Sequence, residues 1–140
     1  PIFIARMPGQ TSGRIRQEMI QPPDLMPTVL DFLKKPIPPT VQGASMLPLL
    51  QGQKKAWRPA AVSASHRSFA QISDRRWLYG TWVHKHPPKL FDRKTDPDQK
   101  RDVLKKNPVV ARRLHRKLVA ELKRLGSPAD FVQTINDKIG

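Results

Sequence analysis

The stretch Leu90-Phe91-Asp92-Arg93-Lys94-Thr95-Asp96-Pro97-Asp98-Gln99 indicates how the second half of this chain folds. Its apolar start is typical of the end of a strand, and Asp96 followed by Pro97 favours a turn. Asn107 and Pro108 then mark the start of a helix, because asparagine caps helices and proline needs no hydrogen-bond partner in the first turn. We therefore expect a strand, a turn and a helix in this order.

The helix is predicted over 108–125 by apolar residues at helical spacing, and a glycine and a proline just past its end, Gly126 and Pro128, favour termination there. The apolar stripe consists of Val110, Leu114, Leu118, Leu122 and Leu125, and the basic residues Arg112, Arg113, Arg116, Lys117, Lys123 and Arg124 fill much of the rest. Residues 127–140 predict a last short helix or a frayed tail.

Upstream of the opening stretch, short runs of β-prone residues separated by turn residues predict strands. They are expected at 61–65, 68–73, 76–83 and 89–91. The fold class is therefore predicted as α+β. An antiparallel sheet of about four strands packs on the long helix through its leucine stripe.

The first part of the chain predicts different elements. Residues 2–7 carry an apolar run that indicates a buried strand, ended by Pro8-Gly9. Residues 24–33 predict a helix that is apolar on two neighbouring faces and is therefore expected to be buried. Residues 43–52 predict a compact turn with a helical segment. The basic, polar run after Gly52 is the best boundary, so we expect domains at 1–58 and 59–140.

Composition narrows the function. The 140 residues include 15 prolines and no cysteine, so no disulfide, thiolate metal site or cysteine nucleophile is possible in this chain. No apolar run approaches the length of a membrane span. The net charge of +15 would attract nucleic acid, anionic lipid or sulfated glycan. The alternative is a soluble protein with a high isoelectric point, or a fragment cut from a more acidic whole.

Two basic segments are candidate anion contacts. His84-Lys85-His86 has three interpretations, namely a metal pair, a contact to an anion and a solvated loop. The absence of a nearby carboxylate makes it a poor metal site. His66-Arg67 lies between two predicted strands and is either a plain turn or a contact to an anionic substrate. Arginine suits the second role because its forked donors match sulfate or carboxylate.

The acidic residues of the opening stretch invite a calcium interpretation, since Asp92, Asp96, Asp98 and Asp102 lie close together in sequence. Their spacing is not that of a calcium loop, and lysine and arginine residues are interleaved. Turn and helix-capping roles are therefore predicted for them. The basic face of the helix over 108–125 either contacts phosphates of a nucleic acid or is simply solvated.

Four segments of the chain, taken in order, resemble the C-terminal third of sulfatases, which belong to the alkaline phosphatase superfamily. They cover about residues 1–125 and comprise Pro1-Ile2-Phe3-Ile4-Ala5-Arg6-Met7-Pro8-Gly9, Asp24-Leu25-Met26-Pro27-Thr28-Val29-Leu30, Gly43-Ala44-Ser45-Met46-Leu47-Pro48-Leu49-Leu50-Gln51-Gly52 and residues 90–103. The last resembles "Leu-Tyr-Asp … Asp-Pro-x-Glu-x-x-Asn-Leu". Phe91, Gln99 and Asp102 replace the tyrosine, glutamate and asparagine of that pattern.

The resemblance implies that residues 1–58 are the last strand and helices of an α/β catalytic domain and that residues 59–140 are the small C-terminal subdomain. It implies hydrolysis of sulfuric esters in the intact protein, through a formylglycine made within a Cys/Ser-x-Pro-x-Arg motif and through a divalent cation, usually calcium. That motif is absent from this chain. We therefore expect no catalytic residue, metal ligand or cofactor here, and expect those groups upstream of Pro1.

The resemblance also implies partners. These are the N-terminal catalytic portion of the same protein and an anionic, sulfated substrate, whose binding mouth the C-terminal loops border. His66, Arg67, His84, Lys85 and His86 are the candidate substrate-binding residues. Without its sheet neighbours the strand at 2–7 predicts self-association of the chain, or disorder of residues 1–20.

Several alternatives stay open. Members of the same superfamily cleave phosphate and phosphonate esters. A basic module that binds sulfated glycan or nucleic acid is the other function class. The compartment stays open as well, with a periplasmic or secreted parent as the expectation that the resemblance carries.

Overall fold

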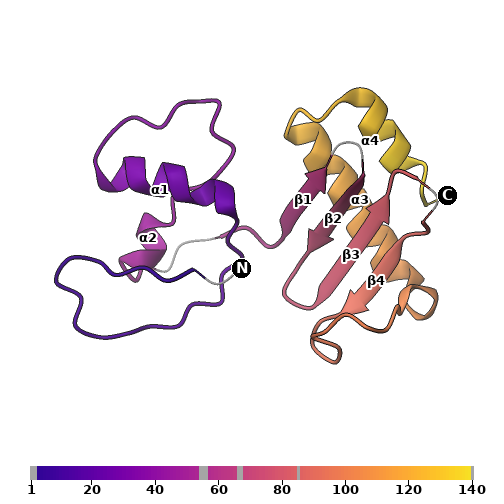
Figure 1. Ribbon diagram of the computed structural model, residues 1–140, viewed down its shortest axis with the longest axis horizontal. Coiled ribbons are helices and arrows are strands. Elements are labelled where there is room, and N and C mark those ends of the chain that lie inside the picture. The colour runs from indigo at the N-terminus through magenta and orange to yellow at the C-terminus, as the bar shows by residue number, and fades with distance from the viewer. Residues whose placement is uncertain (1–2, 54–56, 66–67, 85, 140) are drawn as a thin grey trace. The chain divides into compact units, whose positions relative to one another are not determined.

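The computed structural model describes residues 3–53, 57–65, 68–84 and 86–139 (Figure 1). The chain divides into two compact units, an N-terminal unit of residues 1–58 and a C-terminal unit of residues 59–140.

The N-terminal unit contains the 3-10 helix η1 (Pro22–Asp24) and the helices α1 (Leu25–Phe32) and α2 (Leu47–Leu50). The two α-helices are linked through Thr28, whose hydroxyl donates to the Asp24 carbonyl at 2.5 Å and accepts from the Met46 N–H at 2.8 Å. Gly43 is required where the connecting loop returns, because a Cβ there would lie 2.0 Å from the Pro23 carbonyl oxygen.

Two predictions for this unit are wrong. The first is the strand: residues 3–7 form none, and Ile4 is 88% exposed. A strand needs a hydrogen-bonded neighbour, and among the described residues the paired strands all belong to the C-terminal unit.

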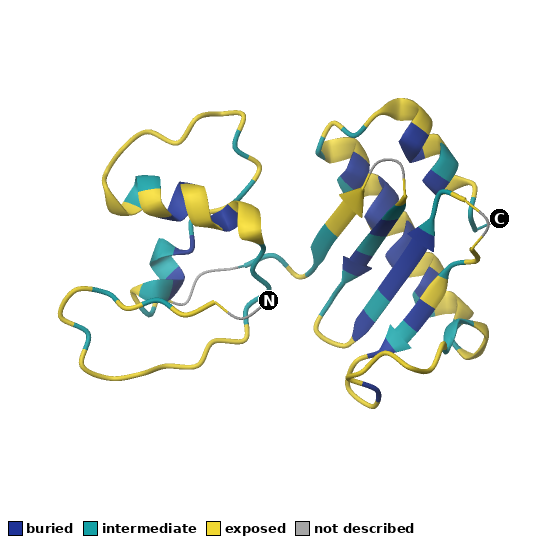
Figure 2. Ribbon diagram, in the orientation of Figure 1, coloured by how far each residue is buried: buried dark blue, intermediate teal, exposed yellow. Residues whose placement is uncertain are grey.

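The second concerns the helix α1, which is present but is not buried as predicted. Only Pro27 and Thr28 are buried, and Figure 2 shows much of α1 as exposed. Large apolar side chains that are 46–55% exposed are Leu25, Met26, Val29, Phe32 and Leu33. The apolar residues of α1 lie on more than one side of the helix, and burying them would need contacts on all these sides. Within the unit, α2 packs against only part of α1.

The C-terminal unit is built on a four-stranded antiparallel sheet with the order β1-β2-β3-β4. Its elements are β1 (Ala61–Ser65), β2 (Phe69–Ser73), β3 (Trp77–Trp82), β4 (Lys89–Asp92), the 3-10 helix η2 (Leu104–Lys106), α3 (Pro108–Arg124) and α4 (Ala129–Asn136). These bounds confirm the predicted α+β fold, with four strands and a long helix. The last short helix also forms.

The core lies between one face of this sheet and α3, with α4 packed on α3 (Figure 1). Ile72, Tyr79 and Leu90 pair across neighbouring strands and therefore form one row on the same face, and each is 0–1% exposed. Leu114, Leu118 and Leu122 of α3 and Phe131, Val132 and Ile135 of α4 complete the cluster. The predicted leucine stripe is thus the side of α3 that the sheet covers.

Candidate functional site

At one end of the sheet lie the described residues next to the two segments that the sequence singles out as anion contacts. Phe69, at the start of β2, pairs with Trp82, at the end of β3. The Val83 N–H also donates to the Ser68 carbonyl at 2.9 Å. The β3–β4 connection, which carries His84 and His86, therefore starts beside the β1–β2 turn. His66, Arg67 and Lys85 lie outside the described residues.

His84 and His86 are both exposed. The His86 N–H donates to the His84 carbonyl at 2.5 Å, which makes this part of the connection tight. The ring of His86 lies edge-on to Trp82, with 6.1 Å between the ring centroids. Exposed imidazoles offer N–H donors to an anion. Among the described residues no group of three or more His, Cys, Asp or Glu side chains is placed to hold a metal ion.

At the opposite end of the sheet the aspartates hold the turns, as their spacing predicts. Asp92 accepts from the guanidinium of Arg76 at 2.8 Å and from the Lys94 N–H at 3.1 Å. The hydrogen bond from Arg76 keeps the pKa of the Asp92 carboxyl below its usual range. Asp102 accepts from the backbone N–H of Leu90 at 3.1 Å and thereby ties the next loop to β4.

Asp96 has the same kind of role. Its carboxylate accepts from the backbone N–H of Arg101 at 2.8 Å and of Lys100 at 3.2 Å. The first of these hydrogen bonds makes the largest contribution to lowering the pKa of Asp96. Asp92, Asp96 and Asp102 therefore use their oxygens on backbone and guanidinium donors, which leaves them poorly suited to calcium.

The N-terminal unit contains a buried ion pair that sequence reasoning missed. Asp24 is completely buried and accepts from the guanidinium of Arg58 at 2.5 and 2.8 Å, and from the N–H groups of Gln21 and Ala44 at 2.7 and 2.9 Å. Arg58 also lies 5.3 Å from the ring centroid of Trp57. Nothing local in the sequence around Asp24 signals a partner 34 residues away.

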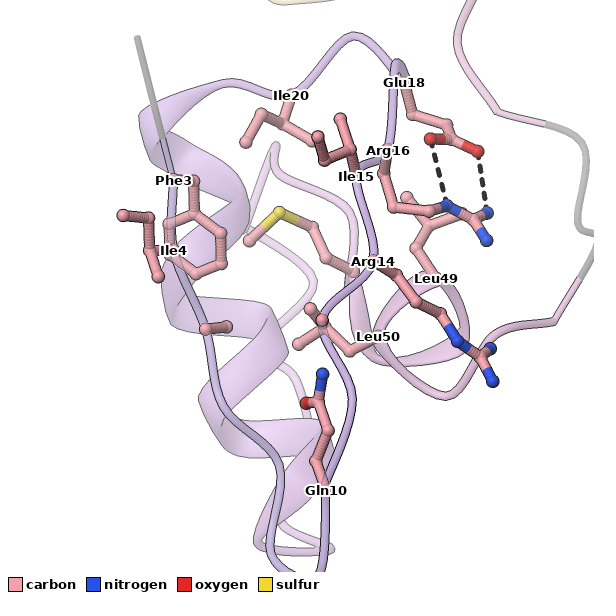
Figure 3. A pocket seen from close by; sticks show the side chains of 13 residues that line it. Phe3, Ile4, Gln10, Arg14, Ile15, Arg16, Glu18, Ile20, Leu49 and Leu50 are labelled. Atoms are coloured by element: carbon pink, nitrogen blue, oxygen red, sulfur yellow. Dashed lines mark hydrogen bonds and ion pairs between the residues drawn. The ribbon is translucent and has the colours of Figure 1, made fainter.

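The same unit has a cleft of about 570 Å³, shown in Figure 3. Its lining is mainly apolar and includes Phe3, Ile4, Ile15, Ile20, Met46, Leu49 and Leu50. The carboxylate of Glu18 also lines the cleft, and it pairs with Arg16 at 2.7 Å. That hydrogen bond lowers the pKa of Glu18, so this carboxylate is no proton donor near neutral pH.

A buried polar bridge joins three elements of the C-terminal unit. His115 of α3 is 4% exposed; its Nδ1 lies 3.1 Å from the hydroxyl of Tyr79 on β3, and its Nε2 lies 3.1 Å from the carbonyl oxygen of Asn136 in α4. A carbonyl only accepts, so Nε2 carries the proton, and in the neutral ring Nδ1 accepts from the tyrosine hydroxyl. Burial raises the pKa of Tyr79, which keeps its proton in place.

This bridge predicts a pH dependence of stability. Burial lowers the pKa of His115, so the unfolded chain binds a proton more readily than the folded one. Stability is therefore expected to fall as pH drops from about 7.5 to about 5.5, through the ordinary histidine pKa. Urea unfolding at both pH values should show a larger loss for the wild type than for His115→Gln. His84→Gln, at an exposed position, is the control; equal losses in all three proteins would contradict the prediction.

Comparison with known proteins identifies the family. A family model described as N-sulphoglucosamine sulphohydrolase, C-terminal, matches residues 1–127, which is most of the chain. The chain belongs to this family. The resemblance to the C-terminal portion of sulfatases is thereby confirmed.

Two curated relatives are sulfatases. An endo-4-O-sulfatase of Bacteroides thetaiotaomicron is 27% identical over an alignment 162 residues long, which covers 98% of this chain and 32% of that protein. Arylsulfatase K of Gallus gallus is 28% identical over 132 residues, which cover 82% of this chain and 24% of that protein. The chain thus spans about a third of the first relative and about a quarter of the second.

Solved structures share its fold. A structure described under the metabolism of multiple glycosaminoglycans by Bacteroides thetaiotaomicron matches with a TM-score of 0.79 and 24% identity, covering 96% of this chain and 33% of that chain. A phosphonate monoester hydrolase from Silicibacter pomeroyi matches with a TM-score of 0.75 and 26% identity, covering 85% and 28%. In the described part of this chain, no helix has the length and apolarity to cross a membrane.

Proposed function

We propose that this chain is the C-terminal part of a sulfatase and that the intact protein hydrolyses sulfuric esters. The family match over residues 1–127 carries the proposal, and the two curated sulfatases support it. Sulfate is favoured over phosphonate because both curated relatives are sulfatases, although a phosphonate monoester hydrolase shares the fold.

The proposal divides the work within the intact protein. The N-terminal catalytic portion supplies the formylglycine nucleophile, and its acidic residues bind calcium. Residues 1–58 complete the α/β catalytic domain, and residues 59–140 form the C-terminal subdomain. The exposed apolar side chains of α1 and the wall of the cleft suit cover by the catalytic portion; in the isolated chain they favour self-association.

The anion contacts complete the proposal. We place a substrate-binding role on His84, Lys85 and His86 together with His66 and Arg67. The exposure of His84 and His86, and the pairing of Phe69 with Trp82 that sets their connection beside the β1–β2 turn, support this role. These residues would orient a sulfated substrate without taking part in the cleavage of the ester.

The test uses the intact protein that carries this chain, assayed with calcium on an aryl sulfate and on a sulfated oligosaccharide. A double variant, His84→Ala with His86→Ala, is expected to raise KM for the oligosaccharide about tenfold with kcat nearly unchanged, since hydrogen bonds to a charged group are lost. Lys94→Gln, an exposed basic residue beyond the other end of the sheet, is the control.

Two results would count against the proposal. Absence of calcium-dependent hydrolysis of any sulfate ester by the intact protein would refute the sulfatase activity. An unchanged KM for the oligosaccharide in the double variant, with activity present, would refute the substrate-binding role of the histidines and leave the activity standing.

A further inference from the structure

The outer side of α3 carries two rows of basic side chains. Residues separated by four and by seven positions lie on the same face of a helix. Row A therefore consists of Arg112, Arg116 and Lys123, and row B of Arg113, Lys117 and Arg124. All six side chains are exposed, while the opposite side of the helix packs in the core.

The two rows differ in their acidic neighbours. In row B, Arg113 lies 3.4 Å from a carboxylate oxygen of Asp74, and Arg124 lies 2.9 Å from one of Glu121. In row A, by contrast, no member has a carboxylate within 4 Å among the described residues. Row A is therefore a line of positive charge that the described carboxylates do not neutralise.

The length of row A indicates the shape of a partner. Arg112 and Lys123 are 11 positions apart, so at about 1.5 Å per residue the row extends about 16 Å along the helix. A single sulfate or phosphate ion is too small to contact both Arg112 and Lys123, at the two ends of the row. A linear polyanion with repeated charges can contact all three together, and the forked donors of two arginines suit tetrahedral oxyanions.

The surroundings strengthen the electrostatic argument. Residues 59–140 contain 18 lysines and arginines and 8 aspartates and glutamates, a net charge of +10. The electrostatic field of this net charge attracts any polyanion to the unit, and row A provides a binding site for that polyanion. In row B, which lies on the same helix, two of the three positive charges are paired with carboxylates, so row B attracts a polyanion less strongly.

We propose that row A binds a linear sulfated glycan, which gives this chain a contact with a polymeric substrate in addition to the predicted substrate-binding residues. The choice of sulfated glycan over nucleic acid rests on the proposed function. The binding row itself rests only on the charges of α3.

The experiment titrates the 140-residue chain with a heparin oligosaccharide at NaCl concentrations between about 50 and about 300 mM. One variant replaces row A (Arg112→Gln, Arg116→Gln, Lys123→Gln), and a matched variant replaces row B (Arg113→Gln, Lys117→Gln, Arg124→Gln). Each removes three positive charges with a residue that favours helix. Circular dichroism checks that both variants keep their helix content.

We expect the slope of log affinity against log salt to fall by about 2–3 for the row A variant and by less than about 1 for the row B variant. Affinity at the lowest salt should drop at least about tenfold more for row A. Equal losses of heparin affinity in the two variants would show that only the net charge matters and would overturn the proposal. The absence of heparin binding by the wild type would also overturn it.

A DNA duplex of the same length serves as the competing polyanion. Tighter binding of DNA than of heparin, with the same dependence on row A, would overturn the glycan assignment. This binding assay requires no hydrolysis. If the intact protein has no sulfatase activity, the proposed function is refuted, but the measured dependence of binding on row A is unaffected.

Discussion

Replacing Arg58 by methionine is expected to destabilise the N-terminal unit by about 3–5 kcal/mol. Asp24 is completely buried, and among the described residues its carboxylate would then keep the backbone N–H donors of Gln21 and Ala44 alone. A buried carboxylate that loses its cation is costly, whereas the methionine retains part of the packing against Trp57. The loss should appear as faster hydrogen exchange of the amides of α1.

The matched control is Arg16→Met, which breaks the ion pair with Glu18 in the same unit. That pair is more open to water, with side chains 34% and 22% exposed, so its removal is expected to cost about 0–1 kcal/mol. Similar exchange rates for α1 in the two variants would show that the Asp24–Arg58 pair does not hold this unit together.

Leu118→Ala is expected to destabilise the C-terminal unit by about 2–5 kcal/mol. Leu118 is fully buried in the cluster between the sheet and α3, so its truncation leaves a cavity that the row formed by Ile72, Tyr79 and Leu90 cannot close. Urea unfolding followed by the near-ultraviolet circular dichroism of the buried aromatic side chains would measure the loss.

Val109→Ala is the control for this prediction. Val109 lies in the first turn of the same helix and is 72% exposed, so its truncation is expected to change stability by no more than about 0.5 kcal/mol. If Leu118→Ala were as stable as Val109→Ala, the leucine stripe would not be the main contact between α3 and the sheet.

The strands and the long helix could be predicted because their signals are local. In β1 to β4, short β-prone runs end at turn residues, and the leucine spacing of α3 fits one covered face. The prediction of a strand at 2–7 was wrong for a physical reason. Apolar residues indicate that a segment belongs in a core, but a strand also needs a neighbouring strand with which to form hydrogen bonds. The exposed face of α1 has the same origin.

The polar bridges could not be predicted. Asp24 and Arg58 are 34 positions apart, and Tyr79 and His115 are 36 apart, so no spacing rule connects them. The turn role of Asp96 could be predicted because an Asp-Pro turn uses its carboxylate on backbone N–H groups within a few residues. The substrate-binding role of His84 and His86 stays a prediction, since exposure alone does not distinguish a binding loop from a solvated one.

The tight approach at Gly43 restricts how this sequence can diverge. Any side chain there would push against the Pro23 carbonyl and displace the start of η1, including the carboxylate that Arg58 binds. Gly13, by contrast, has open space around it and no special backbone angle. Substitutions at position 13 therefore cost little, whereas a substitution at position 43 requires compensating changes around Pro23. Position 43 is therefore a strongly constrained site in the evolution of this unit.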